Sequence, residues 1–223
     1  MKSLLSYEII ISGHWSALLS CLGIPAYALM TRLLWGRYEE LSPGIFLESF
    51  VILLPLFSGL ATARLMSIEG ENRFEELRLS YPESRFRLPL IRVLMALALI
   101  TLAMMLGILT FFVLWGIPTF NPVPLVILAI SPTIFLTGVS MLINHLSRSY
   151  WAAAASVMMW WFIELQTRGK LSGVLFLFYP LWPTTDTSAV INQMLLLVAG
   201  VGAFTLNLFW YNWKVKLGMS EHG

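Results

Sequence analysis

The sequence has little of what most enzymes depend on. Its single cysteine, Cys21, has no partner for a disulfide and cannot build a cysteine metal site. The three histidines, His14, His145 and His222, lie far apart, and there is no H-E-x-x-H metalloprotease motif. No phosphate-loop sequence G-x-x-x-x-G-K-[ST] occurs, so the chain has no ATP site of the usual kind. We therefore expect no enzyme activity, cofactor or metal in this chain.

Charge is also scarce. Charged residues make up 12% of the 223 residues, whereas hydrophobic residues make up 58%, and Trp occurs 9 times. This leaves too little polar surface to coat a soluble globule of this size. The composition indicates an all-α integral membrane protein with several spans, and we expect residues 1–223 to form a single transmembrane domain.

Six apolar stretches have lengths near or above the roughly 20 residues that a spanning helix requires. They run over about residues 17–35, 45–66, 88–115, 123–143, 150–165 and 189–213, and the fifth is short for a full crossing. The segment before the sixth stretch is apolar at first and is then broken by Pro180 and Pro183. We expect one or two re-entrant or interfacial helices within residues 171–188, because this segment is too short to cross and too apolar for an ordinary loop. Asp186 or Ser188 is expected to cap the sixth helix.

The basic residues indicate how the chain is oriented, since Lys and Arg are enriched in cytoplasmic loops. With six spans and both termini in the cytoplasm, the 14 basic residues divide ten to four. The ten on the cytoplasmic side are Lys2, Arg64, Arg73, Arg78, Arg85, Arg87, Arg92, Arg148, Lys214 and Lys216, and the other four are Arg32, Arg37, Arg168 and Lys170. We therefore expect a multi-pass protein of the cell membrane with both termini cytoplasmic.

The longest polar passage, "SIEGENRFEELRLSYPESRFRLP", lies between the second and third stretches, on the predicted cytoplasmic side. Phe74, Leu77 and Tyr81 recur at helical spacing and give a short helix one apolar edge. Ser80 and Glu83 match the S-x-x-E capping box, which indicates a second helix starting at Ser80. The alternative is an ordinary polar loop whose arginines follow the orientation preference.

The pattern "ENRFEELRLSYPESRFRLPLIRVL" resembles the loop after the second span in permeases of type-2 ABC exporters. The outline of the whole chain, with an N-terminal amphipathic helix and six spans, is similar to theirs. The resemblance implies a cytoplasmic coupling helix within residues 67–87 that docks on a separate ATPase subunit. The docking residues that it implies are Glu71, Arg73, Phe74, Glu75, Glu76 and Leu77.

The function that this resemblance implies is that of a permease. It would work with two copies of an ATPase subunit, which bind ATP and Mg, and with a second permease subunit in a homodimer or related heterodimer. We expect it to export an amphiphilic substrate, such as a lipid-like molecule, a peptide or a drug, because many Leu, Phe, Met and Trp residues without a buried charge array favour such a cargo over a simple ion. A haem-exporter-type permease of cytochrome c maturation and a non-transporting membrane scaffold or immunity subunit stay open as alternatives. We expect contact with membrane lipid and none with nucleic acid.

Three smaller features carry expectations of their own. Residues 1–15 show an amphipathic pattern that predicts an interfacial helix, although the same residues could begin the first span. Glu48 lies near the start of the second stretch, where a carboxylate must be solvated, neutral or paired, and Arg32 is its expected structural partner. The small residues of "GVGAF" around Gly200 favour close helix packing or dimerisation.

Overall fold

The computed structural model describes residues 15–34, 41–71, 87–183 and 188–216. These residues form an all-helical fold, and no β-strand occurs among them. Their helical elements are α2 (Trp15–Leu34), α3 (Pro43–Glu48), the π-helical segment η1 (Ser49–Leu53), α4 (Leu54–Glu71), α6 (Arg87–Trp115), α7 (Val123–Ser147), α8 (Tyr150–Thr167), the 3-10 turn η2 (Gly173–Leu175) and α9 (Ala189–Lys216).

Every predicted apolar stretch coincides with helical structure. Four segments among the described residues are long and apolar enough to cross a membrane: Pro43–Leu65, Leu90–Trp115, Val123–Ser147 and Ala189–Phe209. Helix α2 contributes a shorter apolar stretch, Cys21–Leu34, and the 18-residue helix α8 is not one of the four. Crossings by α2 and α8 therefore stay predictions. The expected interfacial helix and residues 72–86 of the expected coupling region lie outside the described residues.

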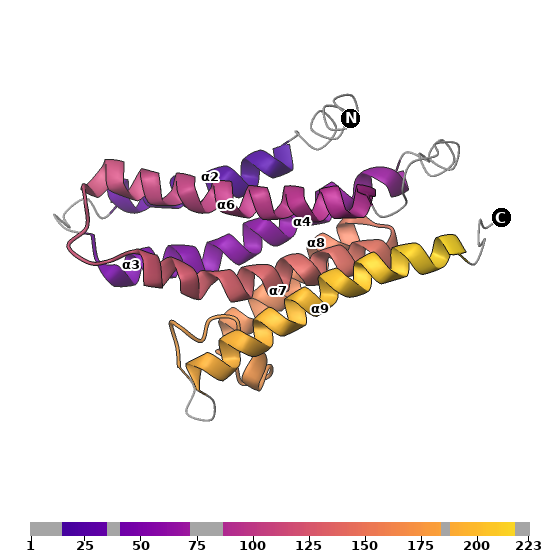
Figure 1. The fold of residues 1–223 in the computed structure, drawn as a ribbon. Coiled ribbons are helices and arrows are strands. Elements are labelled where there is room, and N and C mark those ends of the chain that lie inside the picture. The colour runs from indigo at the N-terminus through magenta and orange to yellow at the C-terminus, as the bar shows by residue number, and fades with distance from the viewer. Residues whose placement is uncertain (1–14, 35–40, 72–86, 184–187, 217–223) are drawn as a thin grey trace.

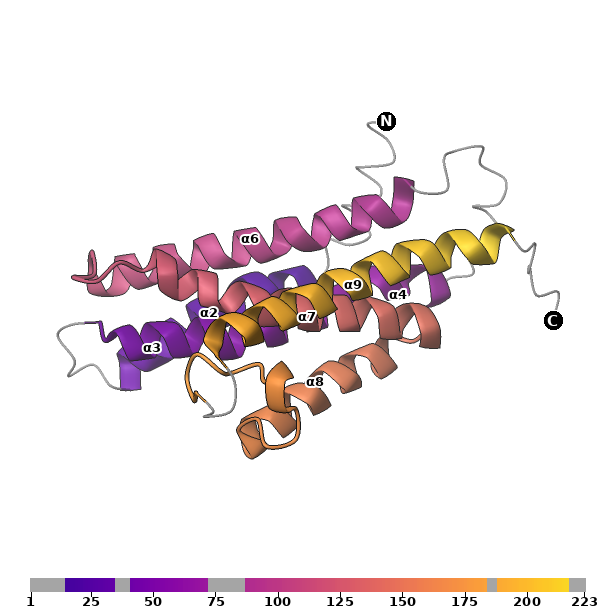
Figure 2. The same ribbon diagram turned by 60° about the horizontal axis from the view of Figure 1, so that its bottom comes forward.

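Successive long helices run in opposite directions along the bundle (Figure 1). At one end of the bundle lie the start of α2, the end of α4, the start of α6, the turn between α7 and α8 and the end of α9. At the opposite end lie the end of α2, the start of α3, the link from α6 to α7 and the link from α8 to α9. The turned view in Figure 2 keeps the same grouping.

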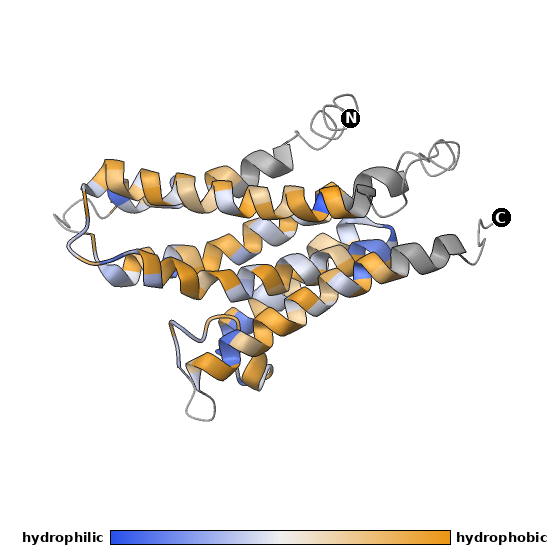
Figure 3. Cartoon of the chain, in the orientation of Figure 1, coloured by the Kyte–Doolittle hydropathy of each residue, from blue (hydrophilic) through white to orange (hydrophobic). Residues whose placement is uncertain are grey.

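Helix α7 is the centre of the packing. It lies against α4 and against α9, and α8 packs on both α4 and α7. Helices α2 and α6 pack on each other, and both contact α4. Hydrophobic residues predominate along the described long helices (Figure 3), and many of them are exposed. The exposed apolar residues of α6 and α9 include Leu94, Met105, Leu109, Val113, Val190, Met194, Val198 and Leu206. We expect a surface of this kind to face lipid or a partner, because exposure of so much apolar area to water is unfavourable.

Two glycines allow α7 and α9 to approach closely. A Cβ atom on Gly138 would lie 2.6 Å from the Gly200 carbonyl oxygen, and one on Gly200 would lie 2.8 Å from the carbonyl group of Ile134. Small residues at helix contacts permit such close backbone approach in membrane proteins. Gly200 therefore packs within this chain, which is one of the two roles predicted for the segment around it.

Helices α4 and α7 are joined by two side-chain hydrogen bonds to backbone oxygens. The Ser140 hydroxyl donates to the Gly59 carbonyl at 2.7 Å, and the Asn144 amide donates to the Ala63 carbonyl at 2.7 Å. Both donors are buried on α7 and lie four residues apart, as do both acceptors on α4. The two bonds thus stand one above the other and fix the rotation of each helix relative to the other.

The start of α9 agrees with one of the predicted caps. The Ile191 N–H donates to the Ser188 hydroxyl oxygen at 3.3 Å, so Ser188 satisfies one of the free amides of the first turn. Ser188 is therefore confirmed as a capping residue, and Asp186 lies outside the described residues.

We predict that Gly200→Ala destabilises the fold, because its methyl group would meet the α7 backbone rather than a movable side chain. The expected loss in free energy of unfolding is about 1–3 kcal/mol, typical of overpacking. The matched control is Gly202→Ala on the same helix, where a Cβ atom meets nothing within 4 Å. Reversible unfolding of both variants in mixed micelles measures the difference. Equal unfolding midpoints for the two variants would contradict the α7–α9 contact.

Candidate functional site

The helix that carries Glu48 changes its geometry partway. Helix α3 continues without a break into the π-helical segment η1 and then into α4. Pro55 stands at the second position of α4. Proline has no N–H to donate, and in a regular α-helix its ring clashes with the carbonyl four residues earlier, here that of Val51. A wider turn just before Pro55 accommodates the ring, and such π-helical turns are frequent at functional sites.

This wider turn determines which way Glu48 faces. Val51 and Ser58 lie seven residues apart, and both are buried. An uninterrupted α-helix would continue this buried face to Glu48, three residues before Val51. In the structure Phe46 and Phe50 are fully buried instead, and Glu48 is exposed. The π-helical segment thus rotates α3 so that two aromatic rings enter the core and the carboxylate stays outside.

Aromatic rings hold α3 in this position. The Phe46 ring centroid lies 4.8 Å from that of Phe50, 5.2 Å from that of Phe111 and 5.8 Å from that of Phe120. Phe111 in turn stacks on Trp115, with centroids 5.4 Å apart. Edge-to-face and offset contacts at these distances add to the burial of apolar area. The cluster fixes α3 against the end of α6 and the link that follows it.

Trp161 of α8 binds the π-helical segment directly. Its indole Nε1–H donates to the Ile52 carbonyl at 2.8 Å. Its ring also meets Phe178 edge-on, with centroids 6.3 Å apart. In an apolar environment a backbone carbonyl without a partner is costly, so a side-chain donor at this irregular turn is stabilising. Trp161 therefore ties the turn to the segment that links α8 and α9.

That linking segment is held by two buried polar side chains. Glu164, 2% exposed, accepts a hydrogen bond from the Ser172 hydroxyl at 2.9 Å and another from the Leu177 backbone N–H. Asn192 of α9 donates to the carbonyls of Val174 at 2.7 Å and Phe176 at 3.0 Å. Irregular backbone inside an apolar bundle requires such partners. The described part of the segment is thus bound into the bundle by side chains of α8 and α9.

The backbone of this segment differs from the expected helix. Helical structure within its described residues is limited to the turn Gly173–Leu175. Gly169, at φ +82°, follows the left-handed Arg168, at φ 48°, and turns the chain back after α8. A Cβ atom on Gly169 would lie 2.7 Å from the Phe176 ring. Left-handed positions and close packing at Gly169 favour a compact loop, and residues 176–179 are buried.

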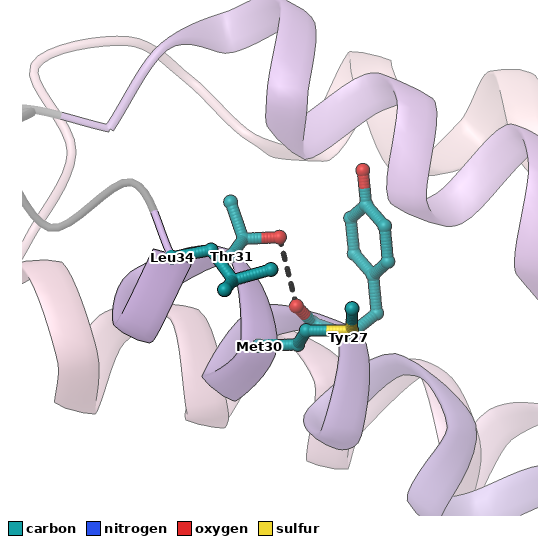
Figure 4. A pocket seen from close by; sticks show the side chains of 4 residues that line it. All are labelled: Tyr27, Met30, Thr31 and Leu34. Carbon is teal, nitrogen blue, oxygen red and sulfur yellow. Dashed lines mark hydrogen bonds between the residues drawn. The ribbon is translucent and has the colours of Figure 1, made fainter.

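A shallow groove lies on α2 near Glu48. It has a volume of about 170 Å³ and is lined by Tyr27, Met30, Thr31 and Leu34 (Figure 4). The Thr31 hydroxyl donates to the Tyr27 carbonyl at 2.8 Å, so it does not offer its proton to a ligand. The walls of the groove are therefore mainly apolar, with one aromatic ring.

Among the predicted site residues, the structure describes Arg32, Glu48 and Glu71. The Arg32 guanidinium lies over the Trp115 ring, 5.5 Å from its centroid, and Glu48 lies by Tyr27. A pair between Arg32 and Glu48 stays a prediction. Glu71 is the last residue of α4. The other implied docking residues, Arg73, Phe74, Glu75, Glu76 and Leu77, lie outside the described residues.

Sequence reasoning missed the residues that hold the irregular parts of the fold. These are Ser140, Asn144, Trp161, Glu164 and Asn192. Each is a polar side chain within or next to an apolar stretch. Such a position is costly without a partner, and it is the feature of the sequence that could have marked these residues. Their hydrogen-bond partners lie from 8 to 109 residues away, which no regular helical spacing would identify. Within the described ranges, no three His, Cys, Asp or Glu side chains come together as a metal site would need.

Comparisons with known protein families, with curated proteins and with solved structures find no match to this chain.

We predict that Trp161→Phe lowers stability, since it keeps the aromatic ring but leaves the Ile52 carbonyl without the indole donor. The expected loss is about 0.5–1.5 kcal/mol in free energy of unfolding. Trp151→Phe is the matched control, because Trp151 is 76% exposed at the surface of the same helix. The two variants are compared by unfolding in mixed micelles. A loss for Trp151→Phe as large as that for Trp161→Phe would exclude a specific role for the hydrogen bond.

Proposed function

We propose that this chain is the membrane-spanning permease subunit of an ATP-driven ABC exporter, with six crossings and cytoplasmic termini. The observation that carries the proposal is the alternating helical bundle, in which α4 ends and α6 begins at the same end. The polar passage that joins them in the sequence therefore starts and finishes at that end. This is the position that the resemblance to type-2 exporter permeases requires for a coupling helix.

The distribution of basic residues supports this orientation. The end of the bundle where α4 ends and α6 begins carries six basic residues, Arg64, Arg87, Arg92, Arg148, Lys214 and Lys216. Arg32, Arg168 and Lys170 belong to the opposite end. Six of these nine residues thus gather at one end, as expected if that end faces the cytoplasm.

The bundle also provides a route from the polar passage to the opposite membrane face. From Glu71, within the polar passage, α4 leads back to the π-helical segment and then to α3, which ends at Glu48. Trp161 and Phe178 connect this segment to the link between α8 and α9. In the proposed mechanism, two ATPase subunits bind ATP and Mg and close on each other. Their movement passes through the polar passage into α4 and changes access to the path between two permease subunits.

The proposed cargo is an amphiphilic molecule. The groove on α2 is mainly apolar, and the surfaces of α2, α6 and α9 expose many large hydrophobic side chains. A substrate that moves along such surfaces must tolerate an apolar environment for most of its length. We expect the second permease subunit to be a copy of this chain or a related chain, and lipid to cover the rest.

We predict that Phe74→Ala weakens association with the ATPase subunit, because Phe74 would provide an apolar anchor in its groove. The expected loss is on the order of 1–3 kcal/mol, or roughly 5- to 150-fold in affinity. Glu76→Ala is the matched control and should cost no more than about 1 kcal/mol, since exposed ion pairs contribute little. Pull-down of the ATPase at equal membrane levels, followed by ATP hydrolysis, measures both.

Two outcomes would contradict the proposed function. If Phe74→Ala binds and stimulates the ATPase as well as the unchanged chain does, the polar passage is only a solvated loop. If no ATPase associates with the unchanged chain, a scaffold or immunity subunit replaces the permease as the better explanation.

A further inference from the structure

The link between α8 and α9 has a buried inner side and an exposed outer side. Its residues 176–179 are buried. Four residues that precede them are exposed and form what we call the outer surface of the link: Arg168, Lys170, Leu171 and Val174. Leu171 is 75% exposed. The two cations favour water or an anion, whereas the two apolar side chains favour an apolar partner. A partner that suits this surface must therefore offer both.

Turn hydrogen bonds hold the outer surface in one compact shape. The Lys170 N–H donates to the Thr167 carbonyl at 3.1 Å. The Gly173 N–H donates to the Gly169 carbonyl at 2.9 Å. Because these two turns overlap along the chain, the basic and the apolar residues stay next to one another. The side chains of α8 and α9 that bind the link from inside keep this coil in place.

The link lies at the level of the first turn of α9. Asn192 donates to the carbonyls of Val174 and Phe176, at 2.7 and 3.0 Å. It comes three residues after Ala189, the first residue of the segment that is apolar enough to cross a membrane. Three residues correspond to about 4.5 Å along a helix. With α9 across the bilayer, the link lies where the headgroup region meets the hydrocarbon core.

The surface of α9 beside the link is apolar. Val190, Ile191 and Met194, in its first two turns, are all more than half exposed. In a membrane such side chains contact acyl chains. The apolar residues of the outer surface therefore adjoin a surface that is suited to lipid.

The outer surface is positively charged. Within residues 165–185 the sequence contains two basic residues, Arg168 and Lys170, and no Asp or Glu. The acidic residue before them, Glu164, is 2% exposed, and its carboxylate is turned into the link, where it accepts the Ser172 hydroxyl. Asp186, which follows, lies outside the described residues. An anionic group would thus meet two exposed cations in the described part of the link.

Arg168 is positioned by an aromatic ring. Its guanidinium lies over the ring of Trp182, 5.3 Å from the centroid, and Trp182 itself is half-buried. A guanidinium over an aromatic ring keeps N–H donors for a phosphate group. Tryptophan is also enriched where the membrane meets water. The pair is suited to holding a phosphate at that level.

We propose that the outer surface of the link is a binding site for an anionic phospholipid, whose phosphate pairs with Arg168 and Lys170. Its acyl chains lie along Leu171, Val174 and the exposed face of α9. A bilayer offers phosphate and acyl chains at adjacent depths beside α9, which favours lipid over a protein partner. The site goes beyond the proposed permease function and does not depend on it.

The test is lipid selectivity at a single probe beside this surface. In the full-length chain with Cys21→Ala, Gln166→Cys carries a fluorophore on the last turn of α8, where Gln166 is exposed. Phospholipids with brominated acyl chains quench the fluorophore on contact. Their titration in nanodiscs gives the affinity of phosphatidylglycerol relative to phosphatidylcholine. We expect a clear preference for phosphatidylglycerol, which falls at high salt because exposed charges are screened.

Arg168→Gln and Lys170→Gln should each lower this preference about fivefold, because one cation near an anionic lipid surface contributes about 1 kcal/mol. The double variant should show little preference. The matched control is Arg148→Gln. Arg148 is also exposed and left-handed at the end of a helix, but it lies at the opposite end of the bundle. This control should keep the full preference.

Three results would overturn the site. The first is equal quenching by the two lipids in the unchanged chain, which would leave a protein partner as the better cover for this surface. The second is a loss for Arg148→Gln as large as that for Arg168→Gln. The third is displacement of the lipid by glycerophosphoglycerol, the soluble headgroup, since a site for phosphate alone would not need Leu171 and Val174. Unfolding midpoints exclude loss of the fold, and the salt dependence of the unchanged chain tests the charge pairing without any substitution.

Discussion

Backbone polar groups inside an apolar bundle need partners from the protein itself, and the rest of this structure depends on that constraint. Regular helices meet it internally, but the π-helical turn before Pro55 and the link between α8 and α9 do not. Trp161 donates to the turn, and Glu164 and Asn192 bind the link. These side chains make irregular backbone stable where a loop would otherwise be excluded.

Helix α7 provides the rigid reference for these irregular parts. Gly138 and Gly200 bring its backbone close to that of α9, and Ser140 and Asn144 bind two carbonyls of α4. The two acceptor carbonyls, of Gly59 and Ala63, lie between the start and the middle of α4. The π-helical turn comes directly before α4, and the polar passage follows its other end. In the proposed mechanism, a displacement of the polar passage would therefore act on a helix that α7 anchors between these two ends.

Much of the fold could be predicted from the sequence, because long apolar runs specify helices directly. The stretches at 88–115 and 123–143 correspond closely to α6 and α7, and the cap at Ser188 was also expected. One or two helices were expected within 171–188, but among the described residues of this segment only the turn Gly173–Leu175 is helical. The polar contacts of Glu164 and Asn192 that hold this backbone could not be predicted from local spacing. The outward direction of Glu48 could not be predicted, because a single extra residue in one turn determines it. The docking role of the residues from Arg73 to Leu77 was predicted from the resemblance to type-2 exporter permeases alone.

The central claim is that all six helical segments cross the membrane in alternation, and accessibility of single cysteines tests it most directly. In a Cys21→Ala background, an impermeant thiol reagent should label Glu76→Cys and Ser147→Cys only from the cytoplasmic side. It should label Thr119→Cys and Lys170→Cys only from outside, because Ser147 and Lys170 lie at opposite ends of α8. Labelling of Lys170→Cys from the same side as Ser147→Cys would show that α8 does not cross and would contradict the account.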